Sequence, residues 1–183
     1  MFDLRGLILG LFGFLAAASA QPVGPVITAG GITTEVCATP VVTAGAYGSG
    51  NVVGGLLTVA PFRPAVTGAP NQGGILQSIR VTLKTVQTAE FDVYQFSSNP
   101  TASTWTDKAA PAINVADVAK VLPPIKLTTP ASGLGTHTVY GSDAIARAKT
   151  GTTVNDYFVI VVVGTPTLGS TSDLQFCATY LVD

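Results

Sequence analysis

The chain has 183 residues, only 10% of them charged, and a formal net charge of −1 at pH 7. This length suits one domain with a sizeable core. The sequence lacks a basic patch, which argues against nucleic acid as a partner. It carries 20 glycines and 12 prolines and is rich in Ala, Val and Thr, so its composition is neither disordered nor helical. A surface so poor in charge is suited to burial in an assembly. The alternative is a surface that stays exposed and consists of uncharged Thr, Ser and Gln side chains.

The first 31 residues are expected to lie outside the folded domain, which we place at residues 32–183. Arg5 precedes an apolar run, and Ala18-Ser19-Ala20 has the small-x-small form that signal peptidase cleaves. The run is short for a transmembrane helix, so no membrane span is expected. If the run is retained, a partner protein must cover it. The candidate contact residues of this apolar and Pro/Gly-rich arm are Phe2, Leu7, Leu9, Phe12, Pro22 and Pro25.

Strand patterns and turn signals follow the arm. The first four predicted strands are Ile32–Thr39, Val52–Val59, Ile75–Val86 and Phe91–Ser97. Gly54-Gly55 predicts a bulge or a close backbone approach in the second. In the third, alternation predicts one inward face, made of Ile75, Ile79, Val81 and Leu83. Gln87-Thr88-Ala89 is interpreted as a turn that makes the third and fourth strands antiparallel neighbours and brings Lys84 near Asp92.

Two long loops are candidate contact regions. Ala60–Gly74 contains three prolines, and Ser98–Pro111 is polar and holds the only tryptophan of the chain. Long irregular loops between strands often carry binding contacts. The candidate contact residues in the two loops are Phe62, Pro64 and Trp105.

Two short helices are predicted in the second half of the chain. Asn114 can cap the first, which Pro123-Pro124 ends. Its apolar side would consist of Val115, Val118, Ala119 and Leu122. Ser142 can cap the second, Asp143–Lys149, which has an acid at its start and bases at its end, as the helix dipole prefers.

The last thirty residues carry the strongest strand patterns. Asn155–Gly164 is a continuous β-branched and aromatic run, which predicts a central strand covered on both faces. Asp173–Val182 alternates with one apolar face, and we expect it to neighbour that run. Ile125–Leu127 and Thr136–Tyr140 are shorter candidates. About eight strands, one or two short helices and no βαβ rhythm predict an all-β fold, an antiparallel β-sandwich or jelly roll.

Cys37 and Cys177 are the only cysteines, and alternation places both on the polar faces of their strands. They could form a disulfide if the first and last strands pair; two unpaired cysteines are the alternative. Together with the single histidine, His137, they cannot supply a four-ligand zinc site without carboxylates. The sequence contains no nucleotide-binding loop, no HExxH motif and no nucleophile elbow. We therefore predict a non-enzyme without catalytic residues, cofactor or metal.

Three stretches of the chain carry a resemblance to a known family: Tyr47–Gly55, Phe91–Thr101 followed by Ala116–Lys120, and Val163–Thr167 with Ser170–Leu174. They resemble small structural proteins of tailed bacteriophages, of the capsid decoration or cement kind. The resemblance implies a β-sandwich on the outer surface of the virion head that binds the major capsid protein and bridges its subunits. The signal-like arm and the cysteines depart from that pattern.

We therefore expect a virion structural protein that stabilises capsid contacts from outside. It should form a homo-oligomer, a trimer in preference to a dimer, because capsid lattices offer such positions. The alternative is a secreted bacterial β-sandwich with an adhesive or carbohydrate-binding role. In that case Trp105, Tyr47 and Tyr94 are the candidate stacking residues. A hydrolase with an unrecognised site is a third, weaker hypothesis.

Overall fold

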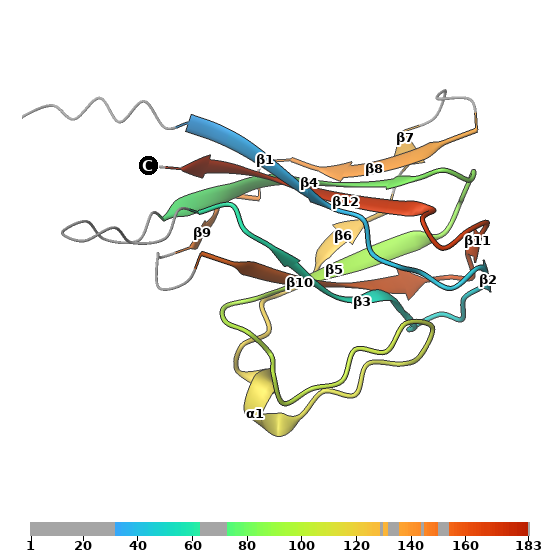
Figure 1. The fold of residues 1–183 in the computed structure, drawn as a ribbon, viewed down its shortest axis with the longest axis horizontal. Coiled ribbons are helices and arrows are strands. Elements are labelled where there is room, and N and C mark those ends of the chain that lie inside the picture. The colour runs from blue at the N-terminus through green and yellow to red at the C-terminus, as the bar shows by residue number, and fades with distance from the viewer. Residues whose placement is uncertain are drawn as a thin grey trace, which may run out of the picture.

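The structure is a computed structural model that describes residues 32–62, 73–128, 130–131, 136–143, 145–149 and 154–182. Its strands form two antiparallel sheets that lie face to face (Figure 1). The all-β sandwich expected from the sequence is therefore confirmed. In the described part of the chain there is a single helix, the four-residue α1 (Val115–Val118).

The strands divide between the two sheets as follows. The first sheet has the order β1-β12-β4-β8-β7, and β9 pairs with the other end of β4. Its members are β1 (Ile32–Ala38), β4 (Gly74–Leu83), β7 (Pro130–Ala131), β8 (Thr138–Ser142), β9 (Arg147–Lys149) and β12 (Leu174–Val182). The second sheet has the order β3-β10-β5-β6. Its members are β3 (Val52–Val59), β5 (Glu90–Phe96), β6 (Ile125–Leu127) and β10 (Asp156–Val163). A small ribbon pairs β2 (Gly45–Ala46) with β11 (Thr167–Leu168).

The order of the strands is that of a jelly roll. Apart from the short β2, β7, β9 and β11, the chain runs β1, β3, β4, β5, β6, β8, β10, β12. These strands form the facing sets β1-β12-β4-β8 and β3-β10-β5-β6, which is the double Greek-key arrangement. Every connection among the eight crosses between the sheets except the one from β5 to β6.

For this reason, two predicted pairs of neighbouring strands are wrong. β4 and β5 lie in different sheets, as do β10 and β12. Lys84 Nζ donates to Ser172 Oγ at 3.1 Å instead of facing Asp92. The segment between β4 and β5 is a crossover, held by the buried Gln87, whose side-chain amide donates to Thr85 Oγ1 and to the Thr167 carbonyl.

A β-bulge in β4 changes which residues face the core. Thr179 pairs with Ser78 but Tyr180 pairs with Leu76, so Gln77 is the extra residue of β4. The alternation therefore reverses before the bulge. Leu76 is fully buried and Ile75 is 40% exposed, which corrects the predicted inward position of Ile75.

The predicted second helix is also wrong. Arg147–Lys149 is the strand β9, which pairs with Gly74–Leu76 of β4. Lys149 is 8% exposed, and its Nζ lies 3.0 Å from Asp156 Oδ1. Burying this lysine against a buried carboxylate requires the extended pairing with β4, which overrides the local charge pattern that favoured a helix.

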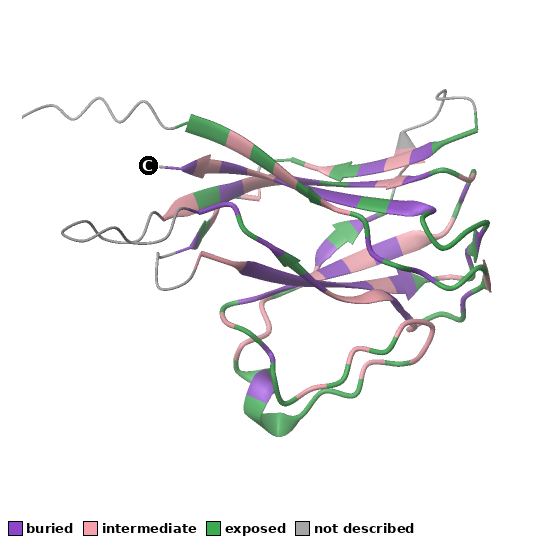
Figure 2. Cartoon of the chain, in the orientation of Figure 1, coloured by how far each residue is buried: buried purple, intermediate pink, exposed green. Residues whose placement is uncertain are grey.

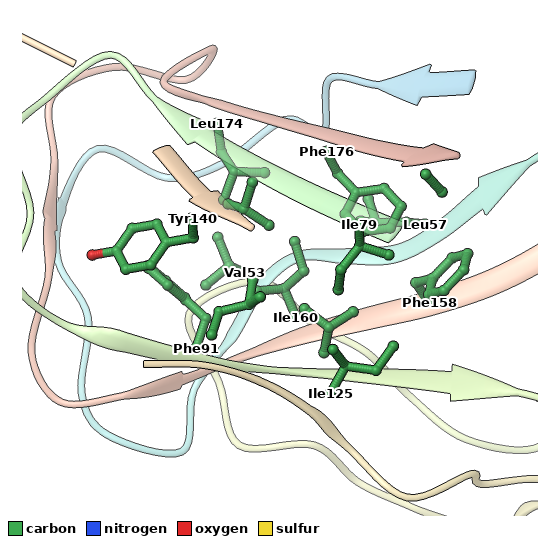
Figure 3. Close-up of a cluster of buried hydrophobic side chains, with 14 of the residues drawn as sticks. Val53, Leu57, Ile79, Phe91, Ile125, Tyr140, Phe158, Ile160, Leu174 and Phe176 are labelled. Carbon is green, nitrogen blue, oxygen red and sulfur yellow. The ribbon is translucent and has the colours of Figure 1, made fainter. Parts of the chain in front are cut away.

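The space between the sheets is filled by one cluster of apolar side chains (Figures 2 and 3). Phe158 and Phe176, from opposite sheets, have ring centroids 4.9 Å apart, and Phe91 meets Tyr140 edge-on at 5.1 Å. Such aromatic pairs contribute about 0.5–1.5 kcal/mol beyond the area that they bury.

A buried carboxylate joins the two sheets at one end of the core. Asp156 is fully buried and accepts from Lys149 Nζ, Gln95 Nε2 (2.7 Å) and Tyr180 OH (2.9 Å). Burial and the nearby carboxylate raise the pKa of Tyr180 far above its usual value, so this hydroxyl stays a donor. The partners come from β5, β9 and β12. Removing the carboxylate would take this acceptor from Gln95 and Tyr180 and would leave the buried Lys149 cation with only the Phe96 and Ser97 carbonyls.

A disulfide links the first and last strands. Cys37 and Cys177 stand opposite each other in the β1–β12 pair, and the structure joins them across a sequence separation of 140 residues. In the chain-entropy model, a disulfide that closes a loop of this length stabilises the folded protein by about 4–5 kcal/mol, as an upper figure.

We predict that Phe176→Ala lowers the free energy of unfolding by about 3–5 kcal/mol, because the ring is fully buried against Phe158. Thr179→Ala, a half-buried position on the other face of β12, should cost much less. Urea unfolding of both variants measures the difference. Equal losses would contradict the assignment of the core face.

Candidate functional site

The outer face of the second sheet is apolar and needs a cover. β10 alternates between Phe158, Ile160 and Val162, which face the core, and Tyr157 and Val159, which belong to a second apolar cluster. The strand is thus apolar on both faces, as its sequence predicts. The connection from β5 to β6, residues 97–124, packs on this second cluster through Trp105 and Val121. We call it the cover loop.

The first polar anchor of the cover loop is Asp107. Its carboxylate accepts from the backbone N–H of Thr43 (2.7 Å), from the backbone N–H of Gly54 (2.6 Å) and from Tyr47 OH (2.9 Å). Tyr47 is 1% exposed, and burial together with this carboxylate raises the pKa of its hydroxyl far above the usual value. The hydroxyl therefore remains a donor, and the loop is fixed to the segment before β3.

The glycine pair in β3 makes this anchor possible. Val159 pairs with Leu56 and Ile160 with Val53, so Gly54 and Gly55 form the bulge that the sequence predicts. Gly54 has φ 73°, and a Cβ there would lie 2.4 Å from Pro40 Cβ. Only glycine fits this position, which turns its N–H toward Asp107.

The second polar anchor is Asp117, which lies inside the cover loop and is fully buried. It accepts from the backbone N–H of Ala102 (2.9 Å), from Ser103 Oγ (2.7 Å) and from Lys120 Nζ (2.7 Å). The Lys120 contact holds the pKa of the Asp117 carboxyl below its usual value. Asn114 caps α1 as expected, with its Oδ1 accepting from Ala116 N at 2.9 Å. The carboxylate thus folds the loop on itself.

The outward side of the cover loop is apolar and exposed. Ile113, Val115 and Val118 are 45%, 85% and 56% exposed, and we call them the apolar tip. The sequence assigns Val115 and Val118 to the apolar side of α1, and in the structure that side is exposed. The buried side of this short helix is instead the Asp117 carboxylate. In Figures 1 and 2, α1 projects from the second sheet on the side away from the first.

An apolar hollow of about 110 Å³ lies between the cover loop and the sheet. It is lined by Tyr94, Phe96, Trp105, Pro111, Ile113, Val121 and Val161. Trp105 meets Phe96 edge-on, with ring centroids 5.1 Å apart. The indole Nε1 of Trp105 is buried and has no hydrogen-bond partner in the described structure. A buried N–H without an acceptor is costly and uncommon.

The contact residues predicted from the sequence have different outcomes. Phe62 is 5% exposed and lies edge-on to Tyr180 at 5.4 Å, so it belongs to the core and cannot offer a contact surface. Trp105 faces the sheet rather than solvent. Tyr47 is buried and cannot act as a stacking platform for a sugar. The residues that lie outside the described part of the chain are Phe2, Leu7, Leu9, Phe12, Pro22, Pro25 and Pro64.

The apolar tip was missed, although a signal was present. The stretch Ala109–Ala116 contains no charged residue, which is unusual for a surface loop. The contact loop predicted from the sequence ends at Pro111, and the short helix predicted after it begins at the cap Asn114.

The described residues offer no evident catalytic or metal cluster. Glu35 lies close to the sulfurs of Cys37 and Cys177, but those sulfurs are bonded to each other and are not thiolates. His137 is exposed, and its Nδ1 lies 3.2 Å from Oγ1 of the neighbouring Thr136.

Comparisons with known proteins do not assign the chain to a family. A scan against family models and searches of curated proteins and solved structures find no match. Among the described residues, no helix has the length and apolar character needed to cross a membrane.

We predict that Asp107→Ala loosens the cover loop, because Gly54 N–H and Tyr47 OH lose this acceptor and Thr43 N–H keeps only its bond to the Tyr47 hydroxyl. Hydrogen bonds to charged groups contribute about 1.5–3 kcal/mol, so a loss of stability of that order is expected. Emission of the single tryptophan should shift to longer wavelength as Trp105 becomes exposed. The matched control is Thr106→Ala, an exposed neighbour that should change neither quantity. Identical behaviour of the two variants would show that Asp107 does not hold the loop.

Proposed function

We propose that the protein is a structural component of a tailed-phage virion. It would bind the outside of the capsid and stabilise the contacts between major capsid subunits. The observation that carries this proposal is the apolar tip, three exposed aliphatic side chains on a loop that two carboxylates hold in place. The resemblance of three sequence blocks to capsid decoration proteins supports it. The jelly-roll fold is consistent with this proposal, but proteins with this fold have many different functions.

The tip suits burial against another protein. Each aliphatic side chain that passes from water into an interface contributes about 1.5–3 kcal/mol. The neighbouring Ala110, Ala112, Ala116 and Ala119 are exposed as well. Desolvating such a surface strands no charge, and a loop already fixed in place loses little entropy on binding.

We further propose that the protein acts as a homo-oligomer, with a trimer preferred to a dimer. A capsid surface repeats its subunits around local symmetry axes, and closed cyclic symmetry lets identical copies engage them equally. Several weak tips joined in one oligomer would bind far more tightly than one alone.

The test uses Val115→Asp combined with Val118→Asp. Loss of two buried aliphatic contacts, about 3 kcal/mol or more, should weaken binding to capsids prepared without the protein by roughly 100-fold. Cosedimentation measures binding, and the temperature at which capsids release their contents measures stabilisation. The wild type should raise that temperature and the double variant should not.

The matched control is Val86→Asp, which is 65% exposed and lies on the crossover between β4 and β5. It introduces a charge of the same sign, one instead of two, away from the tip and should bind as the wild type does. Melting temperatures of all three proteins show whether each is folded. A double variant that binds and stabilises capsids like the wild type would overturn the assignment of the tip. A wild type that binds no capsid would overturn the proposed function.

A second candidate function is a secreted protein with an adhesive role. The observation that favours it is the Cys37–Cys177 disulfide, because disulfides persist in oxidising environments outside the cell. Virion surfaces are also oxidising, so the bond fits both candidates. The small-x-small sequence at Ala18–Ala20 is the second feature in its favour.

Intact mass separates these two candidates. Secretion predicts a mature chain that starts at Gln21, whereas the virion protein should retain Phe2 and the apolar run that follows. Mass spectrometry of protein purified from its natural source, with and without reductant, gives both the first residue and the state of the disulfide. A chain starting at Gln21 would favour secretion.

A further inference from the structure

A lysine and an aspartate from different sheets meet in the interior of the sandwich. Lys149 of β9 belongs to the first sheet and Asp156 of β10 to the second. Lys149 Nζ lies 3.0 Å from Asp156 Oδ1, and the two side chains are 7% and 0% exposed. Bulk water is therefore excluded from the contact. A primary amine is a nucleophile when neutral, and holding it against a carboxyl group replaces a bimolecular encounter by an intramolecular one.

We propose that these two side chains join covalently: Lys149 Nζ forms an amide bond with Cγ of Asp156, and one water molecule leaves. The folded chain makes this link itself, without a second enzyme or a cofactor. The link ties the first sheet to the second through side chains. The inference is independent of the proposed capsid function, because it concerns the interior of the sandwich and not the apolar tip.

The contacts of Lys149 direct the lone pair of its nitrogen toward the aspartate. An ammonium group has three protons, and Nζ has three acceptors: the Phe96 carbonyl (3.2 Å), the Ser97 carbonyl (3.2 Å) and Asp156 Oδ1 (3.0 Å). Transfer of one proton to Oδ1 gives a neutral amine and a carboxylic acid, and a site without water favours such a neutral pair more than water does. Because the two carbonyls keep the other N–H groups, the lone pair faces the carboxyl group.

The second oxygen of the carboxyl group lies where negative charge develops during the attack. Asp156 Oδ2 accepts from Gln95 Nε2 at 2.7 Å and from Tyr180 OH at 2.9 Å. When Nζ attacks Cγ, Oδ2 becomes the oxyanion of a tetrahedral intermediate, and the two donors stabilise it as an oxyanion hole does. Burial raises the pKa of Tyr180 far above its usual value, so the hydroxyl keeps the proton that it donates.

The reaction is balanced without an external reactant. The bond from Nζ to Cγ forms, and the bond from Cγ to Oδ1 breaks. Oδ1 already carries one proton, takes a second from Nζ and leaves as water, and nothing is oxidised or reduced. The backbone N–H of Tyr157 donates to Oδ1 at 3.0 Å and assists its departure. In the described part of the chain no further carboxyl group is hydrogen-bonded to the pair, so the protons move between its own atoms, and we expect the link to form slowly after folding.

Most of the contacts of the ion pair persist in the amide. The amide oxygen keeps its hydrogen bonds from Gln95 and Tyr180, and the amide N–H keeps the carbonyls of Phe96 and Ser97 as acceptors. The amide carries no charge, so the cost of holding two charges away from water disappears. The site is thus suited to the product as well as to the ion pair.

Mass spectrometry of trypsin fragments tests the proposal on the full-length protein. The chain contains no Lys or Arg after Lys149, and trypsin does not cleave after a lysine whose amine is acylated. After reduction of the disulfide and digestion of the unfolded chain, the linked protein should give one fragment, residues 148–183, lighter than its sequence by one water molecule. An unlinked protein gives residues 150–183 at full mass.

Three variants sharpen the test. Lys149→Arg keeps a cation but lacks a primary amine, so it should remain unlinked. Tyr180→Phe removes one oxyanion donor, and we expect linking to slow by about 100-fold, as for the loss of such a donor elsewhere. The matched control is Tyr140→Phe, a second fully buried tyrosine, whose hydroxyl donates to the Ala89 carbonyl; it should link as the wild type does. Linked fractions are compared at equal times after purification, and melting temperatures show that each protein is folded.

The digest also distinguishes the link from other losses of water. A wild type that is cleaved after Lys149 and yields residues 150–183 at full mass, even after long storage of the folded protein, would overturn the proposal. Residues 150–183 lighter by one water would overturn it too, because an aspartate would then have cyclised onto its own backbone. Equal rates of linking in Tyr180→Phe and Tyr140→Phe would overturn the role given to Tyr180.

Discussion

The structure depends on one constraint: its central strand β10 is apolar on both faces. The sandwich buries one face between the sheets, but the other face would remain in water without a cover. The long connection from β5 to β6 supplies that cover, and it is the only connection among the eight main strands that stays within one sheet. The candidate interaction surface is therefore the outer side of a piece of chain whose inner side is needed for stability.

Four of the ten acidic residues of the chain act inside the fold. Asp117, Asp156 and Asp173 are buried, and Asp107 accepts from two backbone N–H groups and a buried hydroxyl. A backbone N–H that lies outside a strand ladder needs an acceptor when it is buried. Carboxylates at these positions order irregular segments that apolar packing alone would not fix. The consequence is a surface with little charge of its own, which lowers the cost of desolvation when the protein meets a partner.

The sequence predicted the elements of the fold much better than their arrangement. The alternation in Asp173–Val182 and the apolar run in β10 gave the right faces, because side-chain period depends only on local geometry. The predicted approach of Lys84 to Asp92 is wrong, because the segment after β4 is a crossover and not a hairpin. The crossover is held by Gln87, which donates a hydrogen bond to Thr167, a residue 80 positions away. The predicted inward position of Ile75 is wrong because a bulge reverses the alternation along β4. The bulge at Gln77 has no glycine or proline to mark it in the sequence. The tip was missed because α1 buries a carboxylate instead of its valines, and that depends on Ser103 and Lys120.

The position of the disulfide has a mechanical consequence. β1 is an edge strand, and a strand pulled from one end separates from its neighbour one hydrogen-bonded pair at a time. Residues 1–31 join the fold at Ile32, so any tension on that arm acts first on the pair Ile32–Val182. Peeling can proceed only as far as Cys37, where a covalent bond carries the load into β12. Beyond that point the force acts on β12, an interior strand that is paired on both sides, so the arm can bear tension without unravelling the domain.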